Sequence, residues 1–168
     1  MSTPTEADLA RVAAALGDAL RAREWRLATA ESSTGGLIGH AITMTAGASD
    51  YYAGGVICYS NLAKEIGLGV PHELIEAHGA VSEEVAAALA VGAAHRFDTE
   101  LGVSVTGIAG PEGGSQRKPL GTHYLGVARR GHPARVEHRV FTHDREGNKA
   151  AAAMEALQLA LDEVTAAS

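Results

Sequence analysis

The feature that most constrains the fold of this chain is a set of three short apolar segments, each ending abruptly in a polar or glycine-rich turn. They are residues 25–30, 54–59 and 101–105. Apolar segments of this length, bounded by such turns, are typical of buried strands. Residues 31–36 follow the first segment and residues 106–114 follow the third, and both turns contain several glycines. We therefore expect strands that run directly into loops and helices, as in an α/β fold.

Helical segments separate and flank these strands. Apolar side chains recur at helical spacing over residues 9–20, after Thr5 as a predicted N-cap. Ser82 precedes two glutamates and begins another helix, and residues 150–164 form a closing one. Residues 122–141 are β-prone on both sides of a turn, which is typical of an antiparallel pair. This order predicts a three-layer α/β/α sandwich with a mixed, partly parallel sheet.

Length and charge limit the number of domains and the class of partner. The chain has 168 residues and one Cys, with 14 Lys and Arg against 20 Asp and Glu, so its net charge is −6. We expect one domain over residues 1–168, with a core that needs no disulfide or bound metal. An acidic chain lacks the basic face that binds the nucleic-acid backbone, so no nucleic-acid partner is expected. A local basic pocket for one phosphate remains compatible with this charge.

Targeting and metal-binding patterns are absent from the sequence. Residues 1–8 are polar and acidic, and the most apolar run, residues 85–94, is far shorter than the ~20 residues that cross a bilayer. We therefore expect a cytoplasmic protein with no membrane partner. The eight His show no metal-ligand spacing and Cys58 has no Cys nearby, so no metal site is expected.

The polar turns are the predicted place for a ligand, because open α/β sheets bind ligands beyond the carboxyl ends of their strands. Backbone N–H groups of residues 31–36 could hold an anion, or the glycines there could simply permit a tight turn. Neither this turn nor residues 106–114 have the glycine spacing of a dinucleotide-binding loop, and the chain has no Walker A motif.

A hydroxyl, a phenol and an amine flank the second predicted strand, namely Ser49, Tyr59 and Lys64. A Ser needs a base to become a nucleophile. A Lys can be that base when burial lowers its pKa from ~10.4 toward neutrality, a shift of ~3 units. The apolar strand can provide the burial. From spacing alone, a solvated Lys64 and a Ser49 that caps a helix remain the alternative.

Four motifs occur in order along nearly the whole chain. They are Ala30-Glu-Ser-Ser-Thr-Gly-Gly36, Gly54-Gly-Val-Ile-Cys-Tyr-Ser-Asn-Leu-Ala-Lys64, His78-Gly-Ala-Val-Ser82 and Ser104-Val-Thr-Gly-Ile-Ala-Gly-Pro-Glu-Gly-Gly114, the last followed by Lys118-Pro-Leu-Gly-Thr122. Together they resemble the CinA C-terminal domain family, the nicotinamide-nucleotide amidohydrolases, and in particular its stand-alone deamidase form. The resemblance implies an α/β/α sandwich that hydrolyses the carboxamide of nicotinamide mononucleotide to nicotinate mononucleotide and ammonia, without a cofactor.

The resemblance also implies roles for individual residues. The Ser, Tyr and Lys of the family fall on Ser49, Tyr59 and Lys64. The implied substrate-binding residues are Ser32, Ser33, Thr34, Gly35, Gly36, Thr106, Gly107 and Arg145. Arg145 and the backbone donors of residues 33–36 are expected to hold the monophosphate, although Arg145 could instead cap the closing helix.

In the mechanism we expect, neutral Lys64 takes the proton of Ser49, directly or through Tyr59, as Ser49 attacks the carboxamide carbon. An acyl-enzyme forms, ammonia leaves, and water completes the hydrolysis with the same base. Backbone N–H groups near Ser49 or of residues 107–110 are expected to stabilise the oxyanion. Ser32 is the rival nucleophile.

The chain departs from the family pattern at two positions. Ser33 stands where the family usually has Cys, which suggests that this Cys is not the nucleophile. His143 stands where a Gly usually precedes Asp-Arg, which affects the expected pose of Arg145.

Two further expectations concern function and assembly. The alternative function is a non-catalytic module that binds a nucleotide or a protein partner, connected with DNA uptake and recombination. We also expect a homo-oligomer, most simply a dimer. The small residues of 85–94 could pack against a second copy or equally well beneath the sheet.

Overall fold

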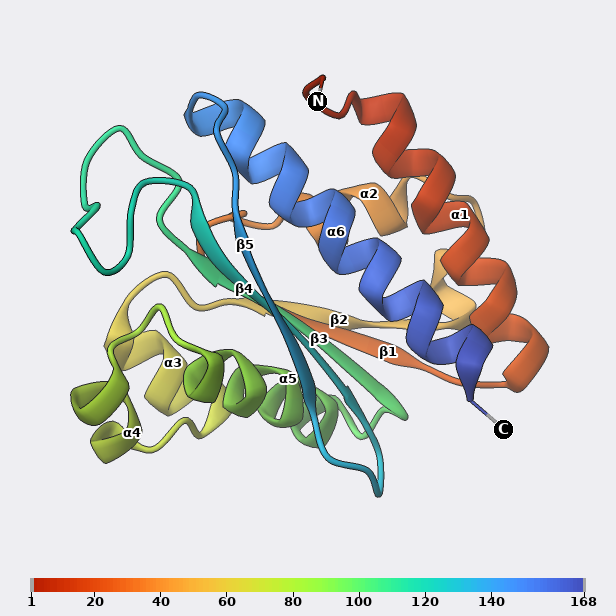
Figure 1. The fold of residues 1–168 in the computed structure, drawn as a ribbon. Helices are drawn as coiled ribbons and strands as arrows, with labels where there is room; N and C mark the ends of the chain where they lie inside the picture. The colour runs from red at the N-terminus through yellow and green to blue at the C-terminus, as the bar shows by residue number, and fades with distance from the viewer. Residues whose placement is uncertain (1, 168) are drawn as a thin grey trace.

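Helices alternate with the first two strands, and three consecutive helices, three consecutive strands and a closing helix follow (Figure 1). The elements are α1 (Glu6–Arg23), β1 (Leu27–Glu31), α2 (Leu37–Thr43), the short 3-10 helix η1 (Ala48–Asp50), β2 (Tyr52–Ile57), α3 (Asn61–Leu68), α4 (His72–His78), α5 (Glu83–Phe97), β3 (Leu101–Gly107), β4 (Thr122–Arg129), β5 (Arg135–Val140) and α6 (Arg145–Ala166). The structure, a computed structural model, describes residues 2–167. The predicted domain of residues 1–168 also includes Met1 and Ser168, which lie outside the described residues.

The sheet has the strand order β2-β1-β3-β4-β5. β1 pairs in parallel with both β2 and β3, and its last residue, Glu31, lies opposite Ile57 on one side and Val105 on the other. The carboxyl ends of the three parallel strands therefore meet at one edge, where ligands of such sheets bind. β4 and β5 add antiparallel strands beyond β3, so the predicted mixed sheet is confirmed.

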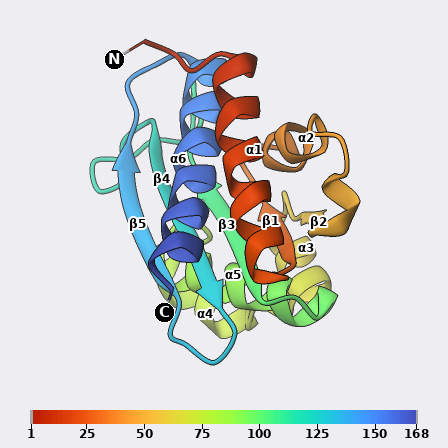
Figure 2. The same cartoon turned by 90° about the vertical axis from the view of Figure 1, so that its right-hand side faces the viewer.

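Helices cover both faces of the sheet, which confirms the three-layer prediction (Figures 1 and 2). α1, α2 and α6 pack on one face, and α3, α4 and α5 pack on the other. Alternate residues of β1 enter the two cores, because side chains along a strand point to opposite faces. Leu27 belongs to the core under α1 and α6, and Ala28 and Ala30 belong to the core under α5.

α5 lies close to β3 because small residues meet where they touch. A Cβ atom on Gly102 of β3 would lie only 2.0 Å from the Ala90 carbonyl oxygen of α5. Ser104, on the same strand, donates a hydrogen bond of 2.6 Å to another carbonyl oxygen of α5, and Leu89 is fully buried. Of the two interpretations of residues 85–94, packing beneath the sheet is the one observed. The homodimer stays a prediction.

Side-chain caps fix the beginnings of the two long helices that lie side by side in Figure 2. Thr5 accepts a hydrogen bond from the backbone N–H of Asp8 and completes a capping box at α1. Asp144 accepts one from the backbone N–H of Gly147 and begins α6. Neither these helices nor any other within residues 2–167 combine the length and apolar character needed to cross a membrane.

Candidate active site

The centre of the candidate site is a contact between Ser32 and Lys64 at the carboxyl edge of the sheet. Ser32 follows β1 and continues the alternation that turns Ala30 toward the α3–α5 layer. Lys64 lies on the first turn of α3, which begins at Ser60 as a side-chain cap. The Lys64 Nζ atom lies 3.1 Å from Ser32 Oγ and donates to the carbonyl oxygen of Cys58 at 2.9 Å. A hydroxyl and a possible base are thus in proton-sharing distance.

Burial decides the ionisation of this pair. Lys64 is 1% exposed, and its hydrogen bonds within the described chain are with uncharged oxygens. Burial lowers the pKa of Lys64, and the nearby ionisable groups of Cys58 and Tyr59 oppose this shift without cancelling it. A neutral amine has a lone pair that can take the proton of Ser32. Burial of Lys64 therefore favours the neutral form that a general base requires.

A cavity of about 170 Å³ opens beside this pair. Seven of the predicted site residues line it: Ser32, Ser33, Tyr59, Lys64, Thr106, Gly107 and Arg145. Asn61 and Val81 also line it; both lie within the quoted motifs, but neither was predicted as a site residue. The structure therefore brings the predicted residues of β1, α3, β3 and α6 into one place.

Two of these residues form the rim of the cavity. Arg145, the first residue of α6, donates one hydrogen bond to the carbonyl oxygen of Gly110 and another, of 3.1 Å, to the Tyr59 hydroxyl. Tyr59 is 63% exposed, so its ring faces solvent at the entrance. The guanidinium of Arg145 thus contacts Gly110 and Tyr59 and does not cap its own helix. The position places a cation where an anionic substrate group would enter.

Thr106 and Gly107 form the cavity wall at the end of β3. The hydroxyl of Thr106 donates 2.8 Å to the carbonyl oxygen of Ala80 and so ties the segment between α4 and α5 to the strand. Gly107 leaves room for the buried ring of His123, because a Cβ atom on it would lie 2.1 Å from the His123 Cδ2. Burial lowers the pKa of His123, so this ring is a neutral packing element.

The turn after β1 holds an internal anion, the carboxylate of Glu31. It accepts hydrogen bonds from the Thr34 hydroxyl at 2.7 Å and from the backbone N–H of Gly36 at 3.1 Å, and also from two amides at the start of α2. The N–H of Gly35 donates to the carbonyl oxygen of Ser32. The prediction that this turn offers free donors to a phosphate is therefore wrong for the Thr34 hydroxyl and for the amides of Gly35 and Gly36, because Glu31 and the turn itself use them.

Two backbone N–H groups of this turn remain available. The amides of Ser33 and Thr34 make no hydrogen bond within residues 2–167, whereas those of Ser32 and Gly35 do. They directly follow Ser32, so they lie beside the atom that would attack a substrate. Ser33 itself lines the cavity.

Ser49 lies elsewhere. It is an exposed residue of η1, which precedes β2, and its neighbour Tyr51 accepts a hydrogen bond from Leu27 at the beginning of β1. Lys64 follows the other end of β2, and a strand of six residues spans about 17 Å. The prediction that Ser49 is the nucleophile paired with Lys64 is therefore wrong. The rival, Ser32, occupies that position.

Three polar residues near the site were missed: Glu31, Asn148 and Lys149. Asn148 is buried, donates to the carbonyl oxygen of Ala109 at 2.9 Å and accepts from the backbone N–H of His143 at 3.0 Å. Lys149 Nζ lies 3.8 Å from the position that a Cβ atom on Gly35 would take. The helical spacing in the sequence could have indicated two of the three. Asn148 and Lys149 follow Arg145 by three and four residues, so the three share one helix face.

Comparison with known sequences finds relatives of this chain. A family model described as the CinA C-terminal domain matches residues 9–164. The chain is 43% identical over 159 residues to a nicotinamide-nucleotide amidohydrolase, PncC, of Enterobacter agglomerans, which covers 95% of this chain and 97% of that protein. It is 50% identical over 145 residues to a CinA-like protein of Salinibacter ruber, covering 86% of this chain but 35% of that protein. The chain thus spans about a third of the length of that relative and of several others.

Solved structures show the same fold. A competence/damage inducible protein, CihA, from Agrobacterium tumefaciens superposes with a TM-score of 0.90 at 34% identity, covering 98% of this chain and 99% of that one. A CinA superfamily protein from Klebsiella pneumoniae gives 0.89 at 32% identity, covering 94% of this chain and 98% of that one.

Proposed function

Because the chain belongs to the CinA C-terminal domain family, we propose that it is an amidohydrolase that converts nicotinamide mononucleotide to nicotinate mononucleotide and ammonia. The observation that carries this proposal is the 3.1 Å contact between Ser32 Oγ and the buried Nζ of Lys64. The relative named as a nicotinamide-nucleotide amidohydrolase, which matches nearly full length, supports the choice of substrate.

The first half of the reaction forms an acyl-enzyme. Neutral Lys64 takes the proton of Ser32 while Ser32 Oγ forms a bond to the carboxamide carbon, giving a tetrahedral intermediate. The carbon–nitrogen bond then breaks, and the proton held by Lys64 passes to the leaving nitrogen, which departs as ammonia. An ester between Ser32 and the nicotinate carbonyl remains.

The second half reverses these roles with water. Lys64, again neutral, takes a proton from a water molecule that attacks the ester carbon. Ser32 Oγ leaves and regains its proton from Lys64, and the carboxylic acid product loses its proton to solvent and departs as the carboxylate. One buried amine therefore serves as base and acid in both halves.

The amides of Ser33 and Thr34 are the donors that we assign to the oxyanion of each tetrahedral intermediate. Amides that directly follow a nucleophile serve this purpose in other hydrolases. Such a donor contributes about 3–4 kcal/mol to the transition state. This role uses the two amides of the turn that Glu31 leaves unoccupied.

The test is ammonia release from nicotinamide mononucleotide by purified variants. Ser32→Ala and Lys64→Met should each lower kcat by about a thousandfold or more, because they remove the nucleophile and the base. Ser49→Ala is the matched control, an identical truncation at an exposed serine, and should keep the wild-type rate. Wild-type turnover by Ser32→Ala would refute the mechanism. A wild-type protein that releases no ammonia would refute the enzyme function and favour the binding-module alternative.

A further inference from the structure

We propose that Glu31 is a positioning residue for catalysis, whose carboxylate holds the amides of Ser33 and Thr34 in place for the oxyanion. This inference rests on the proposed function and deepens it. It gives a part in the reaction to a buried side chain that lies behind the turn, outside the lining of the cavity.

The sheet fixes the backbone at the beginning of the turn. The carbonyl oxygen of Glu31 accepts a hydrogen bond of 2.8 Å from the N–H of Cys58, which directly follows β2. The N–H of Ser32 donates to the carbonyl oxygen of Val105 on β3 at 3.0 Å. The direction in which the next two amides point is therefore decided by what holds the other end of the turn.

The side chain of Glu31 holds that other end. Its Oε2 atom accepts from the Thr34 hydroxyl at 2.7 Å and from the amides of Gly36 and Ile38 at 3.1 and 3.0 Å. Its Oε1 atom accepts from the amide of Gly39 at 2.8 Å. One carboxylate thus links the end of β1 to the beginning of α2, and the two free amides lie between these attachments.

This set of donors requires a carboxylate and not merely a side chain of the same shape. Glutamine has one oxygen and one NH₂ group where glutamate has two acceptor oxygens. With the oxygen at the Oε2 position, the NH₂ group would face the N–H of Gly39. With the oxygen at the Oε1 position, it would face the amides of Gly36 and Ile38. Glu31 is 2% exposed, so a donor that loses its acceptor there stays unpaired or the turn shifts.

A shift of the turn should act on the transition state more than on substrate binding. The amides of Ser33 and Thr34 stabilise a charge that exists only in the tetrahedral intermediates, so their displacement should lower kcat and leave KM. The Lys64 Nζ atom contacts Ser32 Oγ and the carbonyl oxygen of Cys58. A change at the far end of the turn should therefore leave the pH profile of the base in place.

The experiment measures ammonia release from nicotinamide mononucleotide by Glu31→Gln. We expect kcat to fall about 10- to 100-fold, because displaced donors keep part of the contribution that a removed donor loses. KM should stay within about threefold of wild type, and the midpoint of the pH–rate profile should not move. Ser104→Ala is the control for a general loss of stability, since it removes a buried hydrogen bond to α5. It should keep the wild-type kcat.

Two variants of Thr34 keep the test decisive if circular dichroism shows that Glu31→Gln does not fold. Thr34→Val keeps the size of the side chain but lacks the hydroxyl that donates to Glu31, so kcat should fall about 3- to 10-fold with KM unchanged. Thr34→Ser restores the hydroxyl and should recover kcat relative to Thr34→Val.

The outcomes separate this inference from the proposed function. Wild-type kcat in Glu31→Gln, or in Thr34→Val where Glu31→Gln does not fold, would overturn the inference and leave the function standing. A KM that rises as much as kcat falls would also overturn it, because Glu31 would then shape the cavity and not the oxyanion donors. An equal loss of kcat in Ser104→Ala would do the same. A wild-type protein that releases no ammonia would refute the function, and the inference with it.

Discussion

Lys64 is the residue whose protonation should control the rate. Burial lowers its pKa below the ordinary value of 10.5, and only the neutral amine can take the proton of Ser32. We therefore expect kcat to rise with pH to a plateau, with a midpoint below 10.5 that belongs to Lys64. A pH–rate profile measures it, and Ser49→Ala should give the same profile. A rate that keeps rising with pH until the ordinary lysine range, with a midpoint at 10.5, would contradict a buried base.

The burial of Lys64 also lowers the stability of the folded chain. The unfolded chain protonates Lys64 at its ordinary pKa, whereas the folded chain resists protonation until a lower pH. Between the two pKa values the unfolded state binds more protons, so this residue makes stability rise with pH and fall as pH decreases. Below the lower pKa the penalty is complete. The chemistry proposed for Lys64 and its stability cost thus have one cause.

The side chain of Ser33 lies in an environment that is not optimal for a hydroxyl. Its hydroxyl is buried and has no hydrogen-bond partner within residues 2–167. An unsatisfied buried polar group costs about 1–3 kcal/mol. A thiol tolerates such a site better, because Cys behaves as a small apolar side chain. The Cys that the resemblance to the family implies at this position fits this environment, and Ser33 needs no catalytic role to explain it.

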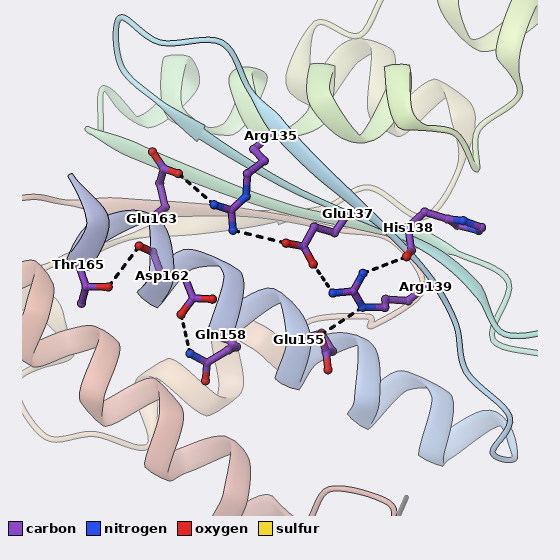
Figure 3. Close-up of polar contacts among 9 residues, drawn as sticks. All are labelled: Arg135, Glu137, His138, Arg139, Glu155, Gln158, Asp162, Glu163 and Thr165. Atoms are coloured by element: carbon purple, nitrogen blue, oxygen red, sulfur yellow. Dashed lines mark hydrogen bonds and ion pairs between the residues drawn. The ribbon is translucent and has the colours of Figure 1, made fainter. Parts of the chain in front are cut away.

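At the scale of elements, a network of charges ties the edge strand β5 to α6 (Figure 3). Glu137 pairs with Arg135 at 3.4 Å and with Arg139, its neighbours on the same face of the strand. The two arginines reach Glu163 and Glu155 on α6, at 3.8 and 3.4 Å. Charged side chains on an edge strand also discourage pairing with another chain.

Glu137→Gln should test this network. It removes the shared partner of two arginines and should lower the free energy of unfolding by about 1 kcal/mol, because exposed pairs contribute up to about this much. The effect should shrink in 1 M NaCl, where the Debye length is about 3 Å. Urea unfolding at low and high salt measures it, with Glu112→Gln in an exposed loop as the control. A loss that does not depend on salt would mean that packing and not charge is responsible.

At the scale of the whole molecule, the fold was predictable because it follows from periodicity. Short apolar segments and the turns after them define parallel strands whose ends share one edge, and this is where the cavity lies. The serine that contacts Lys64 was not predictable in this way. Ser49 is nearer to Lys64 in sequence than Ser32 is, but β2 separates the first pair, whereas parallel pairing of β1 and β2 joins the second.

The anion site was mispredicted for a different reason. Glycines and hydroxyls after a strand are typical of a phosphate-binding turn, and nothing in the spacing reveals that a neighbouring carboxylate fills it. Glu31 does so by folding its side chain back onto the start of α2. Such a contact depends on tertiary packing, and the same is true of the approach of Lys149 to Gly35.

The cavity draws residues from both helical layers, so a bound product should stabilise the molecule as a unit. Lys64 comes from α3 on one face of the sheet and Arg145 from α6 on the other. Nicotinate mononucleotide at 100 times its Kd should add about 2.7 kcal/mol to the free energy of unfolding. For a chain of this size, that raises Tm by roughly 5–10 °C.

Thermal unfolding measures this shift in Tm. Two signals follow the unfolding: the fluorescence of Trp25, the single tryptophan, and far-ultraviolet circular dichroism. Trp25 packs against the core on the α1 side, whereas circular dichroism reports on all helices, so the two signals should move together. Nicotinate riboside, which lacks the phosphate, should give a smaller shift at the same concentration. If the product raised only one of two separate transitions, the two layers would unfold independently and the sheet would not couple them.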